Sequence, residues 1–291
     1  MIQRLAIVGV GLIGGSLARV LRDAGHVQEI VGYGRGLANL QRAVDLGVVD
    51  RVETSLNKAV IGADMVVLAT PVGSMAEILA TMAPYLEDGT VVTDVGSVKG
   101  AVVTTARTAL GAKLPAFVPG HPIAGTERSG VDASFASLFA GRRVVLTPLP
   151  ENRQESIARV RDMWRSAGAD VVEMGIEHHD EVLAATSHLP HLLAYGLVDL
   201  LSRLEDQREV FAFAAGGFRD FTRIASSDPV MWRDISLANH TAIAQMLKAY
   251  QGEIDRLISA IENGNGDALQ KLFTRAKAAR DAMTHNDQKK E

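Results

Sequence analysis

Two hydrophobic patterns divide the chain near residue 174. Before it, short runs rich in Val, Ile and Leu alternate with segments whose apolar residues recur at helical spacing. A run such as Met65-Val66-Val67-Leu68 is typical of a strand buried on both faces of a parallel sheet. This alternation predicts a Rossmann-type, doubly wound parallel α/β domain over residues 1–174. We expect strands at 4–8, 29–33, 64–69, 90–94, 116–118, 143–147 and 170–173, and helices at 14–24, 37–46, 75–86, 98–110 and 151–167.

From residue 175 the strand pattern is absent and long helical stretches follow. Residues 175–291 are therefore predicted to form an all-α domain. Its helices would expose much apolar surface if isolated, so a homodimer joined through them is favoured over a self-contained bundle. We expect helices over 177–204 with a kink at Pro190, over 210–224, over 229–263 from an Asp228-Pro229 start, and over 267–283, with a frayed tail at 285–291.

The composition excludes several classes of partner. Hydrophobic residues make up 47% and charged residues 22% of the 291 positions, and the net charge is −4. Without a basic surplus, binding to nucleic acid or an anionic membrane is not expected. No secretory signal or run of 18 apolar residues is visible, so we expect a cytoplasmic protein with no membrane span. Because the chain has no cysteine, disulfides and thiolate metal sites are excluded.

A glycine motif follows the first predicted strand. Gly9-Val10-Gly11-Leu12-Ile13-Gly14 stands between that strand and a helical pattern, which is the context of a dinucleotide-binding fingerprint. Free N–H groups at the start of such a helix face the pyrophosphate, and glycines let it approach. The alternative is a tight turn that binds no ligand. We expect cofactor contacts at Gly9, Gly11, Leu12, Ile13, Gly14, Arg35, Thr70 and Pro71.

The end of the second strand bears on the choice of nicotinamide. An NAD site usually places Asp or Glu about 20 residues after the fingerprint, against the ribose 2′-hydroxyl. Here the sequence reads Gly34-Arg35-Gly36, with no acid at 34. Because Arg35 could pair with a 2′-phosphate, the sequence favours NADP, or use of both cofactors, over strict NAD. Alternatively, Arg35 is a solvated loop charge or stacks on adenine.

A histidine lies on a constrained segment after a later strand. Pro119 and Pro122 bracket Gly120-His121, and glycines punctuate what we expect to be a loop over 120–130. A titratable side chain held in this way suits proton transfer. Ser97 follows another strand at the same sheet edge. It could hydrogen-bond near the nicotinamide or act as N-cap of the next helix.

Further histidines lie in the predicted helical domain. His188 and His191 are three residues apart and share a helix face. They could bind a metal, but no third ligand stands in an obvious pattern with them, so no metal site is expected. His178 and His179, at the start of the same helix, are expected to serve solvent or capping roles.

An arginine pair lies on the next helical stretch. Arg219 and Arg223 are four residues apart, flank aromatic side chains and could receive a carboxylate. The alternative is a solvated basic face paired with neighbouring acids. Trp232, soon after, is expected in the core.

Taken together, these motifs resemble the prephenate dehydrogenase/arogenate dehydrogenase family. The segments that carry the resemblance, in family order, are 9–14, 94–100, 120–130, 187–191 and 218–234, so it covers nearly the whole chain. The resemblance implies a Rossmann domain with a helical dimerisation domain. It also implies oxidative decarboxylation of prephenate to 4-hydroxyphenylpyruvate, or of arogenate to tyrosine, with NADP or NAD.

The resemblance also assigns residue roles. His121 would take the proton of the ring C4 hydroxyl as hydride leaves C4, and Ser97 would hydrogen-bond His121 or that hydroxyl. Arg223 would hold a substrate carboxylate, and the remaining pocket would be lined by His191, Arg219 and Glu127. Nothing in the sequence separates prephenate from arogenate.

Two alternative functions remain at this point. One is a β-hydroxyacid dehydrogenase or imine reductase, enzymes that commonly rely on a lysine carried by a helix. The other is a non-catalytic, NADP-sensing dimer, which would bind nucleotide without turnover.

Overall fold

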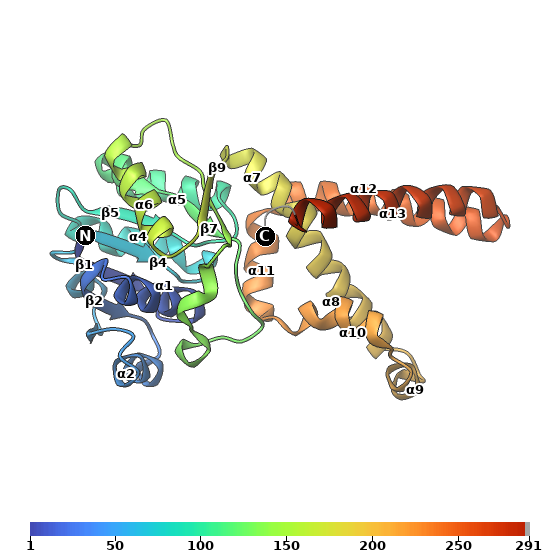
Figure 1. The fold of residues 1–291 in the computed structure, drawn as a ribbon, viewed down its shortest axis with the longest axis horizontal. Coiled ribbons are helices and arrows are strands. Elements are labelled where there is room, and N and C mark those ends of the chain that lie inside the picture. The colour runs from blue at the N-terminus through green and yellow to red at the C-terminus, as the bar shows by residue number, and fades with distance from the viewer. Residues whose placement is uncertain (289–291) are drawn as a thin grey trace. The chain divides into compact units, whose positions relative to one another are not determined.

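A parallel sheet forms the centre of the first part of the chain (Figure 1). The structure is a computed structural model that describes residues 1–288. Within these residues six parallel strands have the order β3-β2-β1-β4-β5-β6, which is the Rossmann order. The strands are β1 (Ile2–Val8), β2 (Val27–Tyr33), β3 (Arg51–Glu53), β4 (Met65–Leu68), β5 (Val91–Asp94) and β6 (Phe117–Val118).

Helices cover both faces of this sheet. On β1, Leu5 and Ile7 pack into one hydrophobic cluster, whereas Ala6 and Val8 pack into another. This alternation explains why the strand is apolar throughout, because each face buries every second residue. The first cluster includes side chains of α1 (Leu12–Asp23), α2 (Leu37–Asp45) and α6 (Gln154–Ser166), and the second those of α3 (Leu56–Val60), α4 (Met75–Met82) and α5 (Gly100–Leu110). The predicted doubly wound domain is confirmed.

Three strands form a separate small sheet that sequence analysis did not distinguish. Its order is β7 (Gly120–Pro122), β8 (Arg143–Leu146) and β9 (Asp170–Glu173), with β7 antiparallel to β8. His121 therefore lies in an edge strand, paired with Val145, and not in a loop as predicted. The flanking prolines obscured this strand, although an edge strand tolerates proline because one side of its backbone needs no ladder partner.

Two short elements and one helix start also differ from the sequence prediction. Strand β3 and helix α3 were missed, because elements of three and five residues show no clear periodicity. Helix α5 begins at Gly100, with Lys99 in the N-cap position. Ser97 is therefore not the N-cap of this helix.

The second part of the chain is helical, as predicted, but more broken. Helix α7 (Ile176–Leu183) runs through a π turn at Ala184–His188 into α8 (Leu189–Ser202). The π turn lies immediately before the expected kink at Pro190, whose ring cannot fit a regular preceding turn. Helix α11 (Pro229–Ala238) starts as expected, because the Asp228 side chain accepts a hydrogen bond from the Met231 N–H.

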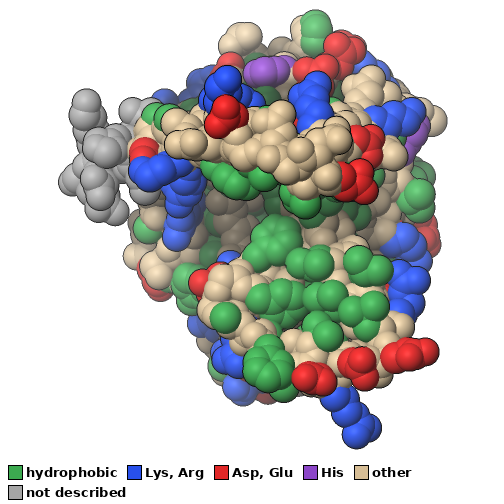
Figure 2. Space-filling view, turned by 90° about the vertical axis from the view of Figure 1, so that its right-hand side faces the viewer, with side chains coloured by type: hydrophobic (Ala, Val, Ile, Leu, Met, Phe, Trp, Pro, Cys, Tyr) green, Lys and Arg blue, Asp and Glu red, His purple; other side chains and the backbone are tan. Residues whose placement is uncertain are grey.

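The predicted helix over 210–224 is wrong. It is divided into α9 (Gln207–Ala212) and α10 (Gly216–Thr222), followed by a 3₁₀ turn at Arg223–Ser226. Gly216 and Gly217 disfavour a helix interior and stand where a new helix starts after extended Ala215. Hydrophobic side chains gather on the face shown in Figure 2. Exposed hydrophobic residues of helices α8 to α10 include Leu200, Phe213 and Phe221.

The chain separates into compact units of residues 1–243 and 244–291. Helix α12 (His240–Glu262) is separated from α11 by Asn239, so the predicted helix over 229–263 is interrupted there. Helix α13 (Gly266–Gln288) includes part of the tail predicted to fray, and 289–291 lie outside the described residues.

Exposed apolar residues recur every three or four positions on α12: Leu247, Tyr250, Ile254, Ile258 and Ile261. None of the helices in residues 1–288 is long and apolar enough to span a membrane.

Candidate active site

The glycine motif forms the turn between β1 and α1. Gly9 has φ +104°, and a Cβ atom there would lie 2.4 Å from the Ala69 carbonyl oxygen. At Gly14 a Cβ atom would lie 2.3 Å from the Gly9 carbonyl oxygen, so this glycine permits close helix–strand packing. At Gly11, in contrast, a Cβ atom would meet nothing within 4 Å. These glycines therefore have different roles: Gly9 and Gly14 allow the turn, and Gly11 leaves space in front of the helix.

The start of α1 fits a bound pyrophosphate. No side chain caps the helix, which begins at Leu12, so its first N–H groups have no side-chain acceptor. Beside the turn, the buried Oγ1 atom of Thr70 has no hydrogen-bond partner among the described residues. Arg35 is exposed just beyond β2, with no acid beside it. The residues of the glycine turn and the start of α1 are suited to a dinucleotide.

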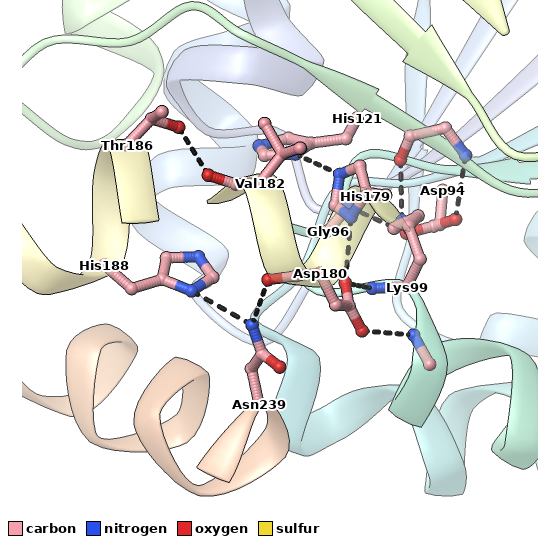
Figure 3. A network of polar contacts seen from close by, with 12 residues as sticks. Asp94, Gly96, Lys99, His121, His179, Asp180, Val182, Thr186, His188 and Asn239 are labelled. Carbon is pink, nitrogen blue, oxygen red and sulfur yellow. Dashed lines mark hydrogen bonds and ion pairs between the residues drawn. The ribbon is translucent and has the colours of Figure 1, made fainter. Parts of the chain in front are cut away.

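His121 is buried and joined to a second histidine. Its Nδ1 atom lies 2.9 Å from Nε2 of His179, and Nδ1 of His179 lies 2.8 Å from Oδ1 of Asp180 (Figure 3). The solvent or capping role predicted for His179 is wrong, because this side chain is completely buried. His178, its neighbour, is exposed. Strand β7 and helix α7 thus bring together residues 58 positions apart.

Asp180 joins this histidine pair to helix α5. Its carboxylate accepts hydrogen bonds from the backbone N–H groups of Lys99 and Gly100, both at 2.8 Å. A carboxylate in this place satisfies two unpaired donors of the helix and complements its dipole. Burial opposes ionisation, but the hydrogen bonds from His179 and from these two N–H groups hold the pKa of Asp180 below its ordinary value. Asp180 is therefore a carboxylate.

A fully buried ion pair supports the strand that carries His121. The Lys99 ammonium pairs with Asp94 at the end of β5 and also donates to the Gly120 carbonyl at 2.7 Å. Asp94 accepts from the N–H groups of Gly96 at 2.8 Å and Gly120 at 3.2 Å. The ion pair thus binds both the N–H and the carbonyl group of Gly120, the residue before His121.

The surroundings of His121 favour its neutral form. Burial, followed by the positive charge of Lys99 and then by His179 and His188, lowers its pKa well below the ordinary value of 6.5. A neutral imidazole can accept a proton near pH 7, whereas an imidazolium cannot. The site therefore contains a residue able to act as a base.

Two more histidines pack on Trp232 of α11. The His191 ring stacks on the indole with centroids 3.8 Å apart, and its Nδ1–H donates to the Ser187 carbonyl at 2.9 Å. His188 is buried against the edge of the same indole, and burial is the main cause that lowers its pKa to about 4. Its Nε2 atom is buried with no partner among the described residues. Within the described part of the chain, no three His, Asp or Glu side chains form a potential metal site.

The two parts of the chain also meet at an ion pair between Arg223 and Glu127. Arg223 starts the 3₁₀ turn after α10, and its side chain is 63% exposed. Arg219 lies on the surface of α10. Ser97 is half-buried in the β5–α5 loop, and the Nδ1 atom of His121 contacts His179 instead of Ser97. Four residues were expected to bind the substrate: Arg223, His191, Arg219 and Glu127. Within residues 1–288, the structure shows a direct contact between two of them, the ion pair of Glu127 with Arg223.

Sequence reasoning missed His179, Asp180, Lys99 and Asp94. For His179 the sequence held a weak signal, because it stands four residues before the apolar Leu183 and so shares a helix face with it. For Lys99 and Asp94, burial depends on tertiary contacts between segments that the sequence pattern does not pair.

Comparisons with known proteins match both parts of the chain. The family described as "Prephenate dehydrogenase, nucleotide-binding domain" matches residues 17–173. The family described as "Prephenate dehydrogenase, dimerization domain" matches residues 176–275. A cyclohexadienyl dehydrogenase of Zymomonas mobilis is 38% identical over 97% of this chain and 96% of its own length.

Solved structures agree over the same length. The crystal structure of Aquifex aeolicus prephenate dehydrogenase in complex with hydroxyphenyl propionate and NAD+ has a TM-score of 0.90 and 38% identity, covering 96% of this chain and 98% of its own. Synechocystis arogenate dehydrogenase has a TM-score of 0.80 and 30% identity, covering 96% and 99%.

Proposed function

The chain belongs to the prephenate dehydrogenase family of NAD(P)-dependent oxidoreductases, and we propose that its reaction uses His121 as the base. The substrate is prephenate, arogenate or both, oxidised and decarboxylated in tyrosine biosynthesis. The observation that carries the role of His121 is its position as a buried, neutral imidazole at the end of the line formed with His179 and Asp180.

The chemistry needs a base that both takes and returns one proton. A bound nicotinamide supplies the acceptor for the hydride from ring C4. His121 accepts the proton of the C4 hydroxyl through Nε2 as the carbon–oxygen bond gains double-bond character. When CO₂ leaves, its bonding pair enters the ring and makes it aromatic, and His121 returns the proton to the oxygen. Ser97 lies in the loop that enters α5 and would orient the hydroxyl.

A direct assay tests this function. Purified protein is incubated with prephenate and with arogenate, each with NAD and with NADP, and the absorbance of the reduced nicotinamide is followed. We expect turnover in at least one combination, together with an equal amount of CO₂. Absence of turnover in all four combinations would reject the proposal.

We propose that Arg223 binds a substrate carboxylate, with Glu127, Arg219 and His191 completing the pocket. The pairing of Arg223 with Glu127 supports this role, because the guanidinium is already placed to bind a carboxylate. Replacing Arg223 by alanine should raise the KM for the substrate roughly 10- to 100-fold, since a charged hydrogen bond contributes about 1.5–3 kcal/mol. The effect on kcat should be smaller.

Steady-state kinetics checks the Arg223 prediction. Arg203→Ala is the matched control, because Arg203 forms an exposed pair with Asp199. An unchanged KM in Arg223→Ala would exclude a role in substrate binding.

We further propose that Arg35 makes NADP an accepted cofactor, alone or beside NAD. Its exposed place just after β2, in the sequence Gly34-Arg35-Gly36 without a neighbouring acid, supports this assignment. Arg35→Ala should raise the KM for NADP about tenfold or more and leave the KM for NAD nearly unchanged, because only NADP carries the 2′-phosphate. Comparison of the two cofactors in the wild type and the variant measures this, and an equal effect on both would contradict it.

The quaternary and domain organisation is also proposed. We place the boundary between the nucleotide-binding and helical domains at residue 174, between the two family matches. A homodimer joined through the helical domain is supported by the description of that domain and by the exposed apolar residues of α12. A cytoplasmic location stays a prediction.

A further inference from the structure

We propose that His179 and Asp180 are positioning residues that fix the tautomer of His121, so that its Nε2 atom is the base. The inference rests on the role proposed for His121. The observation behind it is the unbroken line of contacts from Asp180 through His179 to His121, which is seen in Figure 3.

The first step concerns the proton on His179. The Asp180 carboxylate is ionised and held by the N–H groups of Lys99 and Gly100, so toward His179 it can only accept. Nδ1 of His179, 2.8 Å away, must therefore carry a hydrogen. In a neutral imidazole the other nitrogen then has a free lone pair. Nε2 of His179 is thus an acceptor.

The second step concerns His121. Its Nδ1 atom lies 2.9 Å from that acceptor, so this contact is a hydrogen bond only if Nδ1 of His121 carries the hydrogen. The neutral His121 ring consequently has no hydrogen on Nε2. With a neutral His179 ring, the opposite arrangement, in which His179 donates through Nε2, would set two acceptors against each other at Asp180 and place a hydrogen on the His121 atom that must act as base.

The same line of contacts stabilises the protonated product. When Nε2 of His121 gains a proton, Nδ1–H remains bound to His179, and the negative charge of Asp180 lies one hydrogen bond further on. Lys99 and His188 also face His121, and both oppose a positive charge there. Asp180 is thus the carboxylate that counters them through His179.

The position of the pair is determined by the start of α5 and by the junction between α11 and α12. Asp180 is bound by two N–H groups of α5, and its backbone carbonyl accepts a hydrogen bond from the Asn239 side chain at 2.8 Å. Asn239 lies between α11 and α12, and its hydrogen bond connects this junction to α7. The pair therefore sets the orientation of His121 relative to both parts of the chain.

Two variants of His179 test the inference. His179→Leu removes the acceptor, whereas the amide oxygen of His179→Gln can still accept from Nδ1–H of His121. We expect His179→Leu to lower kcat about 10- to 100-fold, with the KM for substrate and the Kd for nicotinamide little changed. His179→Gln should recover most of this loss, and the exposed control His178→Leu should behave as the wild type.

The tautomer itself is measured by nitrogen NMR of the imidazole rings, with the His121 signals assigned by their absence in His121→Asn. We expect hydrogen on Nδ1 of His121 in the wild type near neutral pH and a shift toward Nε2–H in His179→Leu. Hydrogen on Nε2 in the wild type, or full kcat in His179→Leu, would overturn the inference. These outcomes are separate from failure of the role proposed for His121, which would appear as full activity in His121→Asn, and from failure of the proposed reaction, which would appear as no turnover in the wild type.

Discussion

Replacing His121 by asparagine is expected to lower kcat by about 10²-fold or more, because a positioned general base contributes roughly 10²–10⁴-fold. Asparagine is similar in size and polar but cannot accept the proton of the C4 hydroxyl. The affinity for NAD(P) should be unchanged, since His121 lies in β7 and the glycine turn lies between β1 and α1.

Kinetics and cofactor binding by fluorescence measure both effects. His178→Asn is the matched control, because this histidine is exposed. If His121→Asn retained wild-type turnover, another residue would have to be the base.

A second large effect is expected on stability when Lys99 is replaced by methionine. Methionine fills a similar volume but leaves the Asp94 carboxylate buried without its charged partner. Removal of one member of a buried ion pair costs about 3–5 kcal/mol of unfolding free energy. For a protein of this size, that corresponds to a fall in Tm of roughly 6–20 °C.

The double variant Lys99→Met/Asp94→Asn separates the unpaired charge from lost packing. It should recover part of the loss, because neither charge of the pair remains buried. Recovery should be partial, because an asparagine has one acceptor oxygen for the two N–H groups, of Gly96 and Gly120, that Asp94 accepts. Thermal unfolding at one protein concentration measures all variants. Arg203→Met, at an exposed pair, should change Tm little. A Lys99→Met protein as stable as the wild type would contradict the structural role of the pair.

The structure also bears on the alternative functions. The amine of Lys99, the lysine that acts on the charge of His121, is not free to take part in catalysis, because it is buried, paired with Asp94 and bound to the Gly120 carbonyl. The three relatives compared above, all at least 30% identical to this chain, are named as cyclohexadienyl, prephenate and arogenate dehydrogenases. The resemblance drawn from the order of the motifs is confirmed.

The fold was predictable where hydrophobic periodicity was strong. The continuous apolar run at Met65–Leu68 and the glycine turn at Gly9 were enough to predict the parallel sheet and its nucleotide edge. The second sheet was not predictable in the same way, because β7 has three residues and ends in a proline. The helix breaks before Gly216 and at Asn239 were also not predicted, because the spacing of apolar residues does not show where a helix is interrupted.

The site was predictable only in part. His121 and the glycine motif were found because constrained backbone and strand–turn–helix order mark them locally. His179 was misjudged because a pair of adjacent histidines at a helix start is usually solvated, and only the packing of α7 against β7 buries one of them. The partners that determine the protonation of a base are contributed by distant segments, so a single sequence does not reveal them.

The most direct test of a neutral His121 acting as base is the pH dependence of kcat/KM. Because burial and nearby Lys99 lower the pKa of His121, it stays neutral until the pH falls well below 6.5, and activity is lost only as the pH passes through that lower value. We predict an acid limb below pH 6.5 in the wild type that is absent from the residual activity of His121→Asn. The same acid limb in both proteins would contradict this assignment of the base.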